Sequence, residues 1–165
     1  MLEIYDTIII GGGPAGLTTA LYASRARLKT LLLEKGLPGG QASTTDLIEN
    51  YPGFPQGISG PDLMLNFQEQ AIRFGLDLRY QEVQQAEIEG KTKTVHTAEG
   101  HYKTRTLVVC SGANPRRLGV PGEAEFIGRG VSYCATCDGA LYQGRTIAVL
   151  GGGDAAVEEA LFLTR

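Results

Sequence analysis

The strongest constraint on the fold of this 165-residue chain is a pattern that occurs twice: an apolar run, a glycine-rich loop and a helical segment. The first copy has its apolar run at residues 5–10 and the loop GGGPAG at 11–16. The second copy has them at 146–150 and, as GGGDAA, at 151–156. A β-branched run that leads through glycines into a helix is typical of a parallel strand that opens a βαβ unit. The repeat therefore predicts an α/β protein with two such units.

The first loop has the spacing of a dinucleotide-binding turn. Gly11 permits the tight turn, Gly13 lets the backbone approach a pyrophosphate, and Gly16 lets helix and strand pack closely. Pro14 suits the first helical turn, where its missing N–H has no intrahelical partner. Glu34 follows after about 20 residues, where an acid hydrogen-bonds ribose hydroxyls. The alternatives are a glycine turn without a ligand and a solvated charge at a strand end.

The second loop repeats this logic with Gly151, Gly153 and Ala156. Two such loops predict two dinucleotides, and a flavin with a nicotinamide is the usual pairing because a flavin passes on the two electrons of a hydride. The acid or base that would contact the second ribose is expected beyond Arg165. The alternative is an ordinary turn between a strand and a helix.

The chain divides into two predicted domains, at 1–114 and 115–165, and the second of them contains only the start of its unit. A helix is expected from Pro61, with apolar residues at helical spacing and a stop at Gly75. Glycines at positions 90 and 100 divide a β-meander, and Cys110 ends its last buried strand. The other expected elements are a helix at 14–27, a strand at 29–33, a long and therefore functional loop at 36–60, β-structure at 77–110 with its last strand at 107–110, a boundary at 115–130, a strand at 146–150 and a helix at 154–163.

A pair of cysteines, Cys134 and Cys137, lies just before the second unit. Their Cys-x-x-Cys spacing favours a reactive dithiol, since proximity and helix placement lower the pKa of one thiol. Asp138 follows directly and could protonate an outgoing thiolate. The alternatives are half of a zinc site, two buried inert cysteines, and a turn or cap role for Asp138. Only Cys110, His96 and His101 remain as further zinc ligands, and none forms a second close pair, so no metal is expected.

Composition excludes several classes of function. The net charge is −3 and Lys and Arg form no run, which argues against a nucleic-acid partner. No uncharged apolar run approaches the roughly 18 residues of a membrane span, and the acidic N-terminus does not resemble a signal peptide. Three cysteines, two of them close together, favour a reducing compartment and therefore a cytoplasmic protein.

Three segments carry a resemblance to a known family. The chain resembles the N-terminal half of the low-molecular-weight, bacterial-type thioredoxin reductases, within the FAD- and NAD(P)-dependent pyridine nucleotide-disulfide oxidoreductases. Residues 11–35 are similar to the FAD fingerprint, and 38–55 to the loop that cradles the flavin. SYCATCDGALYQGRTIAVLGGGDAAVEEALFL, from Ser132, resembles the redox segment running into the NADPH domain. Alkyl hydroperoxide reductase flavoproteins share the module but carry an extra N-terminal redox domain.

The resemblance implies a Rossmann-like three-layer FAD domain with a β-meander, followed by the start of a Rossmann-like NAD(P) domain. It implies that Cys137 lies next to the flavin, that Cys134 attacks substrate and that Asp138 donates a proton. Electrons would pass from NADPH through FAD to the Cys134–Cys137 disulfide and on to thioredoxin, in a homodimer. The implied FAD residues are Gly11, Gly13, Pro14, Ala15, Gly16, Glu34, Lys35, Gly40, Gln41, Asn50, Val83 and Gly112, and the implied NADP residues are Gly151, Gly153, Asp154, Ala155 and Ala156.

The sequence departs from the family in two respects. Cys110-Ser111-Gly112 replaces the common Ala-Thr-Gly, a change between small residues. The chain is also shorter than the roughly 250–350 residues that two dinucleotide domains need. Residues 146–165 alone cannot bury enough apolar surface to be well ordered, so they are expected to lack order or to lean on a neighbouring chain. The alternatives to the reductase are a flavin-binding fragment or split-gene half without turnover, and a relative that takes electrons from ferredoxin or another flavin donor.

Overall fold

The computed structural model describes residues 4–164. By their internal contacts the described residues divide into two compact units. The first unit comprises residues 4–49 and 56–113, and the second comprises 50–55 and 114–164. The proposed domain division at residues 114 and 115 stays a prediction.

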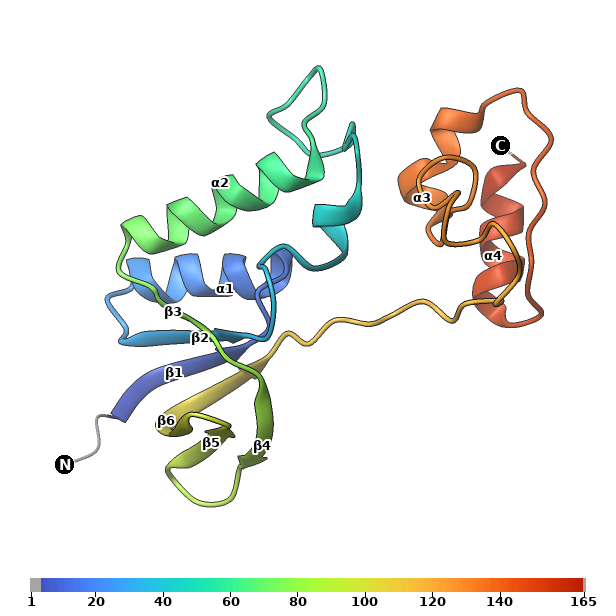
Figure 1. The fold of residues 1–165 in the computed structure, drawn as a ribbon. Coiled ribbons are helices and arrows are strands. Elements are labelled where there is room, and N and C mark those ends of the chain that lie inside the picture. Colours follow the sequence, from blue (N-terminus) through green and yellow to red (C-terminus); the bar gives the residue numbers. More distant parts are fainter. Residues whose placement is uncertain (1–3, 165) are drawn as a thin grey trace. The chain divides into compact units, whose positions relative to one another are not determined.

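The first unit is built on one six-stranded mixed sheet with strand order β3-β2-β1-β6-β5-β4. Strands β3, β2, β1 and β6 are parallel to one another, whereas β4, β5 and β6 form an antiparallel meander. Figure 1 shows helices α1 and α2 side by side on one face of the parallel strands. The elements are β1 (Ile4–Ile10), α1 (Pro14–Arg25), β2 (Thr30–Glu34), the 3-10 helix η1 (Gly40–Thr44), α2 (Gly60–Arg73), β3 (Asp77–Tyr80), β4 (Val83–Glu87), β5 (Lys93–Thr97) and β6 (Gly100–Val109).

Both faces of the parallel strands are buried, which gives three layers. Ile9 and Leu32 pack against α1 and α2, in a cluster with Leu17 and Ala71. Their neighbours in β1 and β2 point to the opposite face and pack against the meander, in a cluster of Tyr5, Ile8, Leu31, Leu33 and Val95. Because alternate residues are buried on both sides, these strands read as continuous apolar runs rather than alternating ones. The predicted α/β, Rossmann-like three-layer fold is confirmed.

Helix α1 ends at Arg25, two residues before the predicted end at 27. Arg27 adopts a left-handed backbone conformation, with φ 60°. Its N–H bonds the carbonyl of Ser24, and the N–H of Leu28 bonds the carbonyl of Ala23. These two bonds form a Schellman motif, which terminates a helix at the left-handed residue. Because glycine usually takes that position, the helix end marked by Arg27 has no recognisable signal in the sequence.

The end of β6 is less buried than expected. The strand at 107–110 was predicted to be buried, but Val109 is 65% exposed and Cys110 is only half-buried. Strand β5 pairs with β6 only over Gly100–Thr104, whereas β1 pairs with it as far as Val109. The last part of β6 therefore has a neighbour on one side only. Strand β3, predicted within the meander region, instead extends the parallel sheet beside β2.

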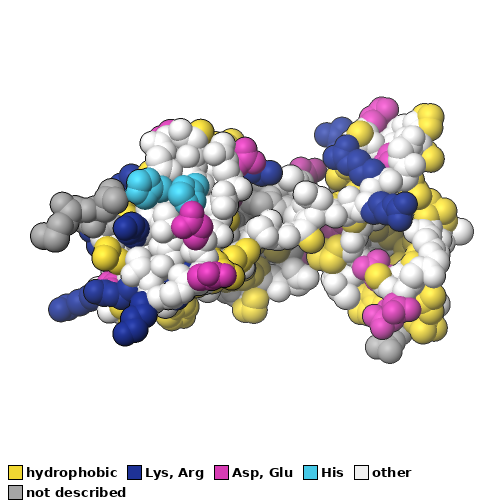
Figure 2. All heavy atoms as spheres, turned by 90° about the horizontal axis from the view of Figure 1, so that it is seen from below, with side chains coloured by type: hydrophobic (Ala, Val, Ile, Leu, Met, Phe, Trp, Pro, Cys, Tyr) yellow, Lys and Arg dark blue, Asp and Glu magenta, His cyan; other side chains and the backbone are white. Residues whose placement is uncertain are grey.

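The second unit contains α3 (Ala135–Asp138), the 3-10 helix η2 (Gly139–Tyr142) and α4 (Asp154–Leu163). The predicted strand at 146–150 is wrong: these residues pair with no strand among residues 4–164. Leu150 is 70% exposed, and Figure 2 shows many hydrophobic side chains on the surface of this unit. An apolar segment needs a neighbour for its N–H and C=O groups to become a strand. Residues 154–163 form α4, as predicted. The expectation that 146–165 lack order or lean on a neighbouring chain stays a prediction.

The two histidines lie together on the meander. His96 and His101 are cross-strand partners in β5 and β6, with ring centroids 5.9 Å apart (Figure 2). His96 Nε2 is 2.9 Å from Glu87 Oε1. None of the helices within residues 4–164 has the length and hydropathy that crossing a bilayer requires.

Candidate functional site: a dinucleotide loop and a redox disulfide

Two glycines of the first loop are required by the protein itself. Gly11 has φ 102°, and a Cβ there would lie 2.3 Å from Cys110 O. A Cβ on Gly16 would lie 1.8 Å from Gly11 O. Strand β6, the loop and α1 therefore pack too closely at these positions for any side chain. The predicted roles of Gly11 in the turn and Gly16 in close packing match this geometry.

Gly13 is different, because no protein atom needs the space of its missing side chain. The atom closest to a Cβ built there is Gly40 Cα at 3.8 Å, an ordinary contact distance. Gly13 is the N-cap of α1, with Pro14 in the first turn. An open, side-chain-free position at a helix N-terminus is the cradle that a phosphate group needs. The loop thus fits the pyrophosphate of a dinucleotide.

Glu34 holds the first loop in place. Its Oε2 accepts the N–H of Gly12 at 2.6 Å, and its Oε1 accepts the N–H of Gly36 at 3.0 Å. The carboxylate is half-buried, so it is not the solvated charge of the alternative interpretation. Each oxygen keeps a second lone pair, which leaves the predicted ribose contact chemically open. The anchoring role was missed, although an acid at the end of β2 beside a glycine loop was the signal for it.

Three segments meet at the carboxyl ends of β1, β2 and β6. The Gly39 N–H donates to Gly12 O at 2.8 Å, which ties η1 to the first loop. The side-chain amide of Gln41 donates to Ala113 O at 3.2 Å, next to Gly112 with φ 68°. Ligands of open α/β sheets bind at this edge. The structure therefore brings the first loop, Gly40, Gln41 and Gly112 together, as the sequence predicts for a cofactor site.

The remaining predicted cofactor residues are less closely associated with this edge. Lys35 is exposed directly after β2. Val83 starts β4 and packs against the core on the meander face. The short connection that leads to it follows Tyr80, which is the register partner of Glu34 in β2. Asn50 is exposed and belongs to the second unit. Their cofactor roles stay predictions.

A polar network on the meander face was not predicted at all. Tyr5 donates to Asp77 Oδ2 at 2.7 Å, and Arg79 donates to Asp77 Oδ2 at 2.9 Å and to the Tyr102 hydroxyl at 3.1 Å. Burial and the bond to Asp77 raise the pKa of Tyr5 to about 12. Burial works against ionisation of Asp77, but the bonds from Arg79 and Tyr5 outweigh it and lower its pKa. The network joins β3, β1 and β6, which are far apart in the sequence, so their contact could not be predicted from it.

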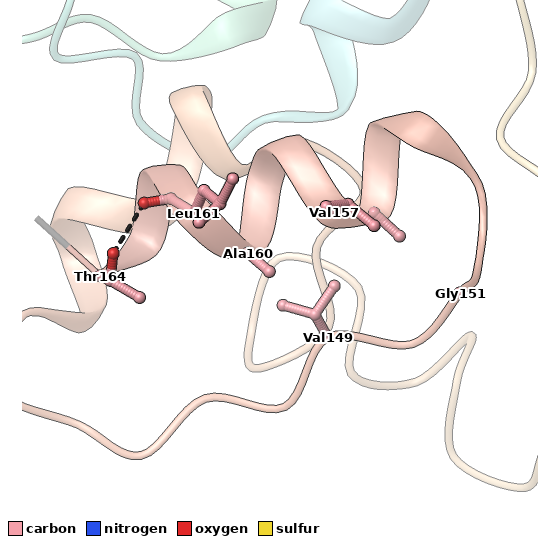
Figure 3. A pocket seen from close by; sticks show the side chains of 7 residues that line it. Val149, Gly151, Val157, Ala160, Leu161 and Thr164 are labelled. Carbon is pink, nitrogen blue, oxygen red and sulfur yellow. Dashed lines mark hydrogen bonds between the residues drawn. The ribbon is translucent and has the colours of Figure 1, made fainter.

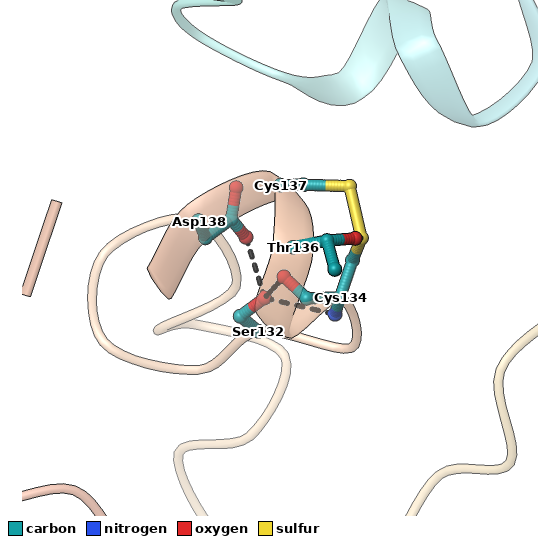
Figure 4. The surroundings of a disulfide bond; sticks show 5 residues. All are labelled: Ser132, Cys134, Thr136, Cys137 and Asp138. Carbon is teal, nitrogen blue, oxygen red and sulfur yellow. Dashed lines mark hydrogen bonds between the residues drawn. A yellow bond between two sulfur atoms is a disulfide. The ribbon is translucent and has the colours of Figure 1, made fainter. Parts of the chain in front are cut away.

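The two cysteines of the second unit form a disulfide, with Cα atoms 5.3 Å apart (Figure 4). Cys134 is the N-cap of α3, and its carbonyl accepts the N–H groups of Cys137 and Asp138. Thr136 Oγ1 lies 3.4 Å from Cys134 Sγ. Cys134 is half-buried and Cys137 is exposed, so the alternative of two buried inert cysteines is wrong. The pair is accessible for thiol–disulfide exchange.

Asp138 is the last residue of α3, and its side chain is bonded to Ser132 rather than to a helix end. Ser132 Oγ donates to Asp138 Oδ2 at 2.5 Å and accepts the N–H of Cys134 at 3.0 Å. Asp138 is also the N-cap residue of η2, in line with the alternative of a turn or cap residue before Gly139, but its side chain makes no capping hydrogen bond there. Ser132 was missed by motif spacing, although a serine hydroxyl often bonds the backbone two residues further on, as it does here at Cys134.

A buried acid fixes the segment in front of the disulfide. Glu123 accepts the N–H groups of Leu118 and Gly119, at 2.9 and 2.6 Å, and the hydroxyl of Tyr133 at 2.5 Å. The bond from Tyr133 and those backbone bonds lower the pKa of Glu123. Because Tyr133 directly precedes Cys134, the predicted boundary region at 115–130 is bonded to the redox segment.

The second glycine loop leads into α4. Gly151 has φ 149°, and a Cβ there would lie 3.0 Å from that of Ala156. Gly153 is the N-cap of α4 and has open space around it, and Asp154 and Ala155 begin the helix. Figure 3 shows Val149 facing Ala160 of α4. A shallow, largely apolar depression runs along this side of the helix, lined by Val149, Gly151, Ala156, Val157, Ala160, Leu161 and Thr164.

Comparisons with known proteins agree with these features. Residues 5–165 match the family model described as pyridine nucleotide-disulphide oxidoreductase. The chain is 51% identical over 164 residues to thioredoxin reductase of Bacillus subtilis, covering 99% of this chain and 51% of that protein. It is 53% identical over 163 residues to the bifunctional thioredoxin reductase/thioredoxin of Mycobacterium leprae, covering 98% of this chain and 36% of that one. The crystal structure of thioredoxin reductase from Streptococcus pyogenes matches with a TM-score of 0.93 and 48% identity, over 99% of this chain and 53% of that chain.

The chain belongs to the pyridine nucleotide-disulphide oxidoreductase family. The predicted resemblance to the bacterial-type thioredoxin reductases is confirmed by both the sequence and the structural matches. The chain spans about half the length of the Bacillus subtilis relative and a smaller share of the bifunctional one.

Proposed function

We propose that the whole protein is a flavin-dependent thioredoxin reductase, and that this chain supplies its FAD loop and its redox-active disulfide. The observation that carries the proposal is the accessible Cys134–Cys137 disulfide, placed just before a glycine loop in a chain of this family. A disulfide that exchanges with substrate must have an accessible sulfur, and this pair has one.

The first unit fits FAD. Gly13 with the N-terminus of α1 would hold the pyrophosphate, Glu34 and Lys35 the ribose, and Gln41 the region of the flavin ring. Asn50 lies in the second unit, and its proposed role near the flavin rests on the family resemblance alone. Gly40 and Gly112 would line the same edge, with the backbone of Val83 beside the adenine. When bound, the flavin supplies two-electron chemistry between a nicotinamide and a disulfide.

The second unit would begin the NADPH site. Gly151 and Gly153 would face a pyrophosphate at the N-terminus of α4, with Asp154, Ala155 and Ala156 in the first turn. The open space at Gly153 supports this, as it does at Gly13. The proposed donor is NADPH, by analogy with the family.

Cys134, Cys137 and Asp138 would carry the exchange with a disulfide substrate. Cys134, as a thiolate, attacks the substrate disulfide, so that one S–S bond forms and one breaks, and Asp138 protonates the departing sulfur. Cys137 then attacks Cys134, which restores their disulfide and releases the second substrate thiol. The substrate gains the two electrons that the Cys134–Cys137 dithiol loses.

Thioredoxin is the proposed partner, and a homodimer in the cytoplasm the proposed state. The Mycobacterium leprae relative is named as thioredoxin reductase and thioredoxin in one chain, which supports this choice of partner. A dithiol that must return to its reduced state at each cycle also suits a reducing compartment.

The test is to trap the partner with cysteine variants of the whole protein. Cys137→Ser should accumulate a mixed disulfide between Cys134 and thioredoxin, seen by mass spectrometry, because no second thiol resolves it. Cys134→Ser should trap none, and neither variant should turn over with NADPH. If Cys134→Ser accumulates the mixed disulfide instead, Cys137 is the attacking cysteine and the two roles are exchanged. Cys137 is more exposed than Cys134, so this outcome must be checked. Full activity of both variants would refute the redox disulfide.

A binding module without turnover is the second candidate. The observation that favours it is the unpaired segment at 146–150, because a nucleotide site on an incomplete sheet lacks the strands that hold the ribose. This candidate predicts retained flavin with no electron transfer, whichever donor is offered, reduced ferredoxin included.

A further inference from the structure

Ser132 is bonded to two different parts of the redox segment. Its Oγ donates to the Asp138 carboxylate at 2.5 Å and accepts the Cys134 N–H at 3.0 Å (Figure 4). The same oxygen lies 3.3 Å from Cys134 O. A hydroxyl has one proton to donate, and the nearer acceptor is Asp138 Oδ2. Ser132 therefore connects the proposed proton donor to the backbone of the proposed attacking cysteine.

A second serine shows what the same pair of bonds does in a purely structural setting. Ser59 Oγ donates to Asp62 Oδ2 at 2.6 Å and accepts the N–H of Asp62 at 3.1 Å. Both partners belong to one residue in the first turn of α2, so Ser59 is a helix cap. The two partners of Ser132 are different residues, and the N-cap of α3 is Cys134, not Ser132. A capping role therefore explains Ser59 but not Ser132.

We propose that Ser132 is a positioning residue that fixes the Asp138 carboxyl relative to Cys134. The inference rests on the proposed function. Within residues 4–164 the bond from Ser132 is the one hydrogen bond to this carboxyl, and it occupies Oδ2. Oδ1 is thereby left as the oxygen that carries the proton and releases it.

The proton then moves as follows in the exchange step. The Cys134 thiolate attacks a substrate disulfide, and the departing sulfur takes the proton from Asp138 Oδ1. The carboxyl becomes a carboxylate, and the Ser132 O–H stabilises the new charge through a charge-assisted hydrogen bond. Without Ser132 the carboxyl rotates freely and samples orientations that cannot deliver the proton, so the step slows although both cysteines remain.

The test compares Ser132→Ala, Asp138→Asn and the double variant in the whole protein, with thioredoxin and NADPH. General acid catalysis is worth roughly 10²–10⁴-fold, and we expect loss of the positioning bond to lower kcat by about tenfold. Asp138→Asn should lower it further, and the double variant should be no slower than Asp138→Asn, because Ser132 acts through Asp138. Ser132→Thr keeps the hydroxyl and should recover most of the rate.

A second readout does not depend on either cofactor. The dithiol is reduced with a phosphine, freed of reductant and mixed with oxidised glutathione, and re-formation of the Cys134–Cys137 disulfide is timed. Ser132→Ala should be about tenfold slower here too. Ser59→Ala is the matched control: it should lower the stability of the folded protein and leave both rates unchanged.

Wild-type rates for Ser132→Ala in both assays, a double variant slower than Asp138→Asn, or no recovery with threonine would each overturn the inference. These outcomes are distinct from failure of the proposed function. If the wild-type protein shows no NADPH-dependent reduction of thioredoxin, the proposed function fails, while the glutathione assay still decides the role of Ser132.

Discussion

The two glycine loops have nearly the same sequence but very different surroundings. The first follows β1, a strand paired on both sides, and is tied to Glu34 and η1. The second follows residues 146–150, which pair with no described strand, although Val149 faces α4. A glycine loop and a helix can form locally, whereas a strand depends on partners elsewhere in the chain. The glycine motif therefore specifies the turn and the helix, and the sheet around it specifies the site.

The largest effect expected from this difference concerns the chain by itself. Residues 1–165 should show no NADPH-dependent disulfide reduction, because a lone loop and helix lack the strands that hold a nicotinamide nucleotide. The measurement is reduction of a small aromatic disulfide with FAD and NADPH added. Turnover like that of an intact reductase would show that the second loop forms a working nucleotide site, and the proposed difference between the two loops would be wrong.

The last glycine of the first loop, Gly16, gives the next largest effect. Gly16→Ala should destabilise the first unit by about 1–3 kcal/mol, since its Cβ would meet Gly11 O at 1.8 Å. The equivalent position of the second loop already carries Ala156. Urea unfolding measures the loss, and Ala156→Gly is the matched change, expected to cost well under that amount. Equal costs would mean that the two loops pack equally tightly.

Substitution of Gly13 distinguishes space that a ligand would fill from space that protein packing requires. Gly13→Ala should weaken FAD binding while changing the stability of the ligand-free protein by less than about 1 kcal/mol, because no protein atom lies within 3.8 Å of the new Cβ. Fluorescence titration with FAD and urea unfolding without it test the two halves of this expectation. Unchanged FAD affinity would remove the first loop from the cofactor site.

The Tyr5–Asp77–Arg79 network on the meander face predicts a dependence of stability on alkaline pH. The pKa of Tyr5 is raised to about 12 from an ordinary value of 10.0, so the folded state holds this proton more tightly than the unfolded state. Its contribution is present below pH 10 and is lost as the pH rises towards 12. Tyr5→Phe should remove this part of the pH dependence in urea unfolding. Tyr22→Phe, at an exposed position, is the control and should leave it intact.

The smallest effect concerns the end of α1. Arg27→Gly should stabilise the first unit by less than about 1 kcal/mol. Glycine avoids the roughly 1–2 kcal/mol that a left-handed backbone costs another residue, but it loses more conformational entropy on folding, which offsets part of this gain. A rise in the urea midpoint without a change in slope would confirm it. A fall would mean that the Arg27 side chain contributes contacts that its exposure does not suggest.

Local chemistry was readable from the sequence alone. The turn at Gly11, the helix after Pro14, the disulfide pair and the meander all follow from residues close together along the chain, where steric and hydrogen-bonding rules act directly. The α/β class follows from the repeated strand–loop–helix order. These parts of the fold and of the candidate site could be predicted because each depends on neighbours a few residues away.

Tertiary structure decided the rest. Glu34 as the anchor of Gly12, the Tyr5–Asp77–Arg79 network and the exposed end of β6 each depend on which strands lie side by side. The segment at 146–150 is as apolar as 5–10, yet only the latter is a strand, because only it has neighbours to bond. A sequence determines what a segment can form, and hydrogen-bonding partners distant in the chain determine whether it does so.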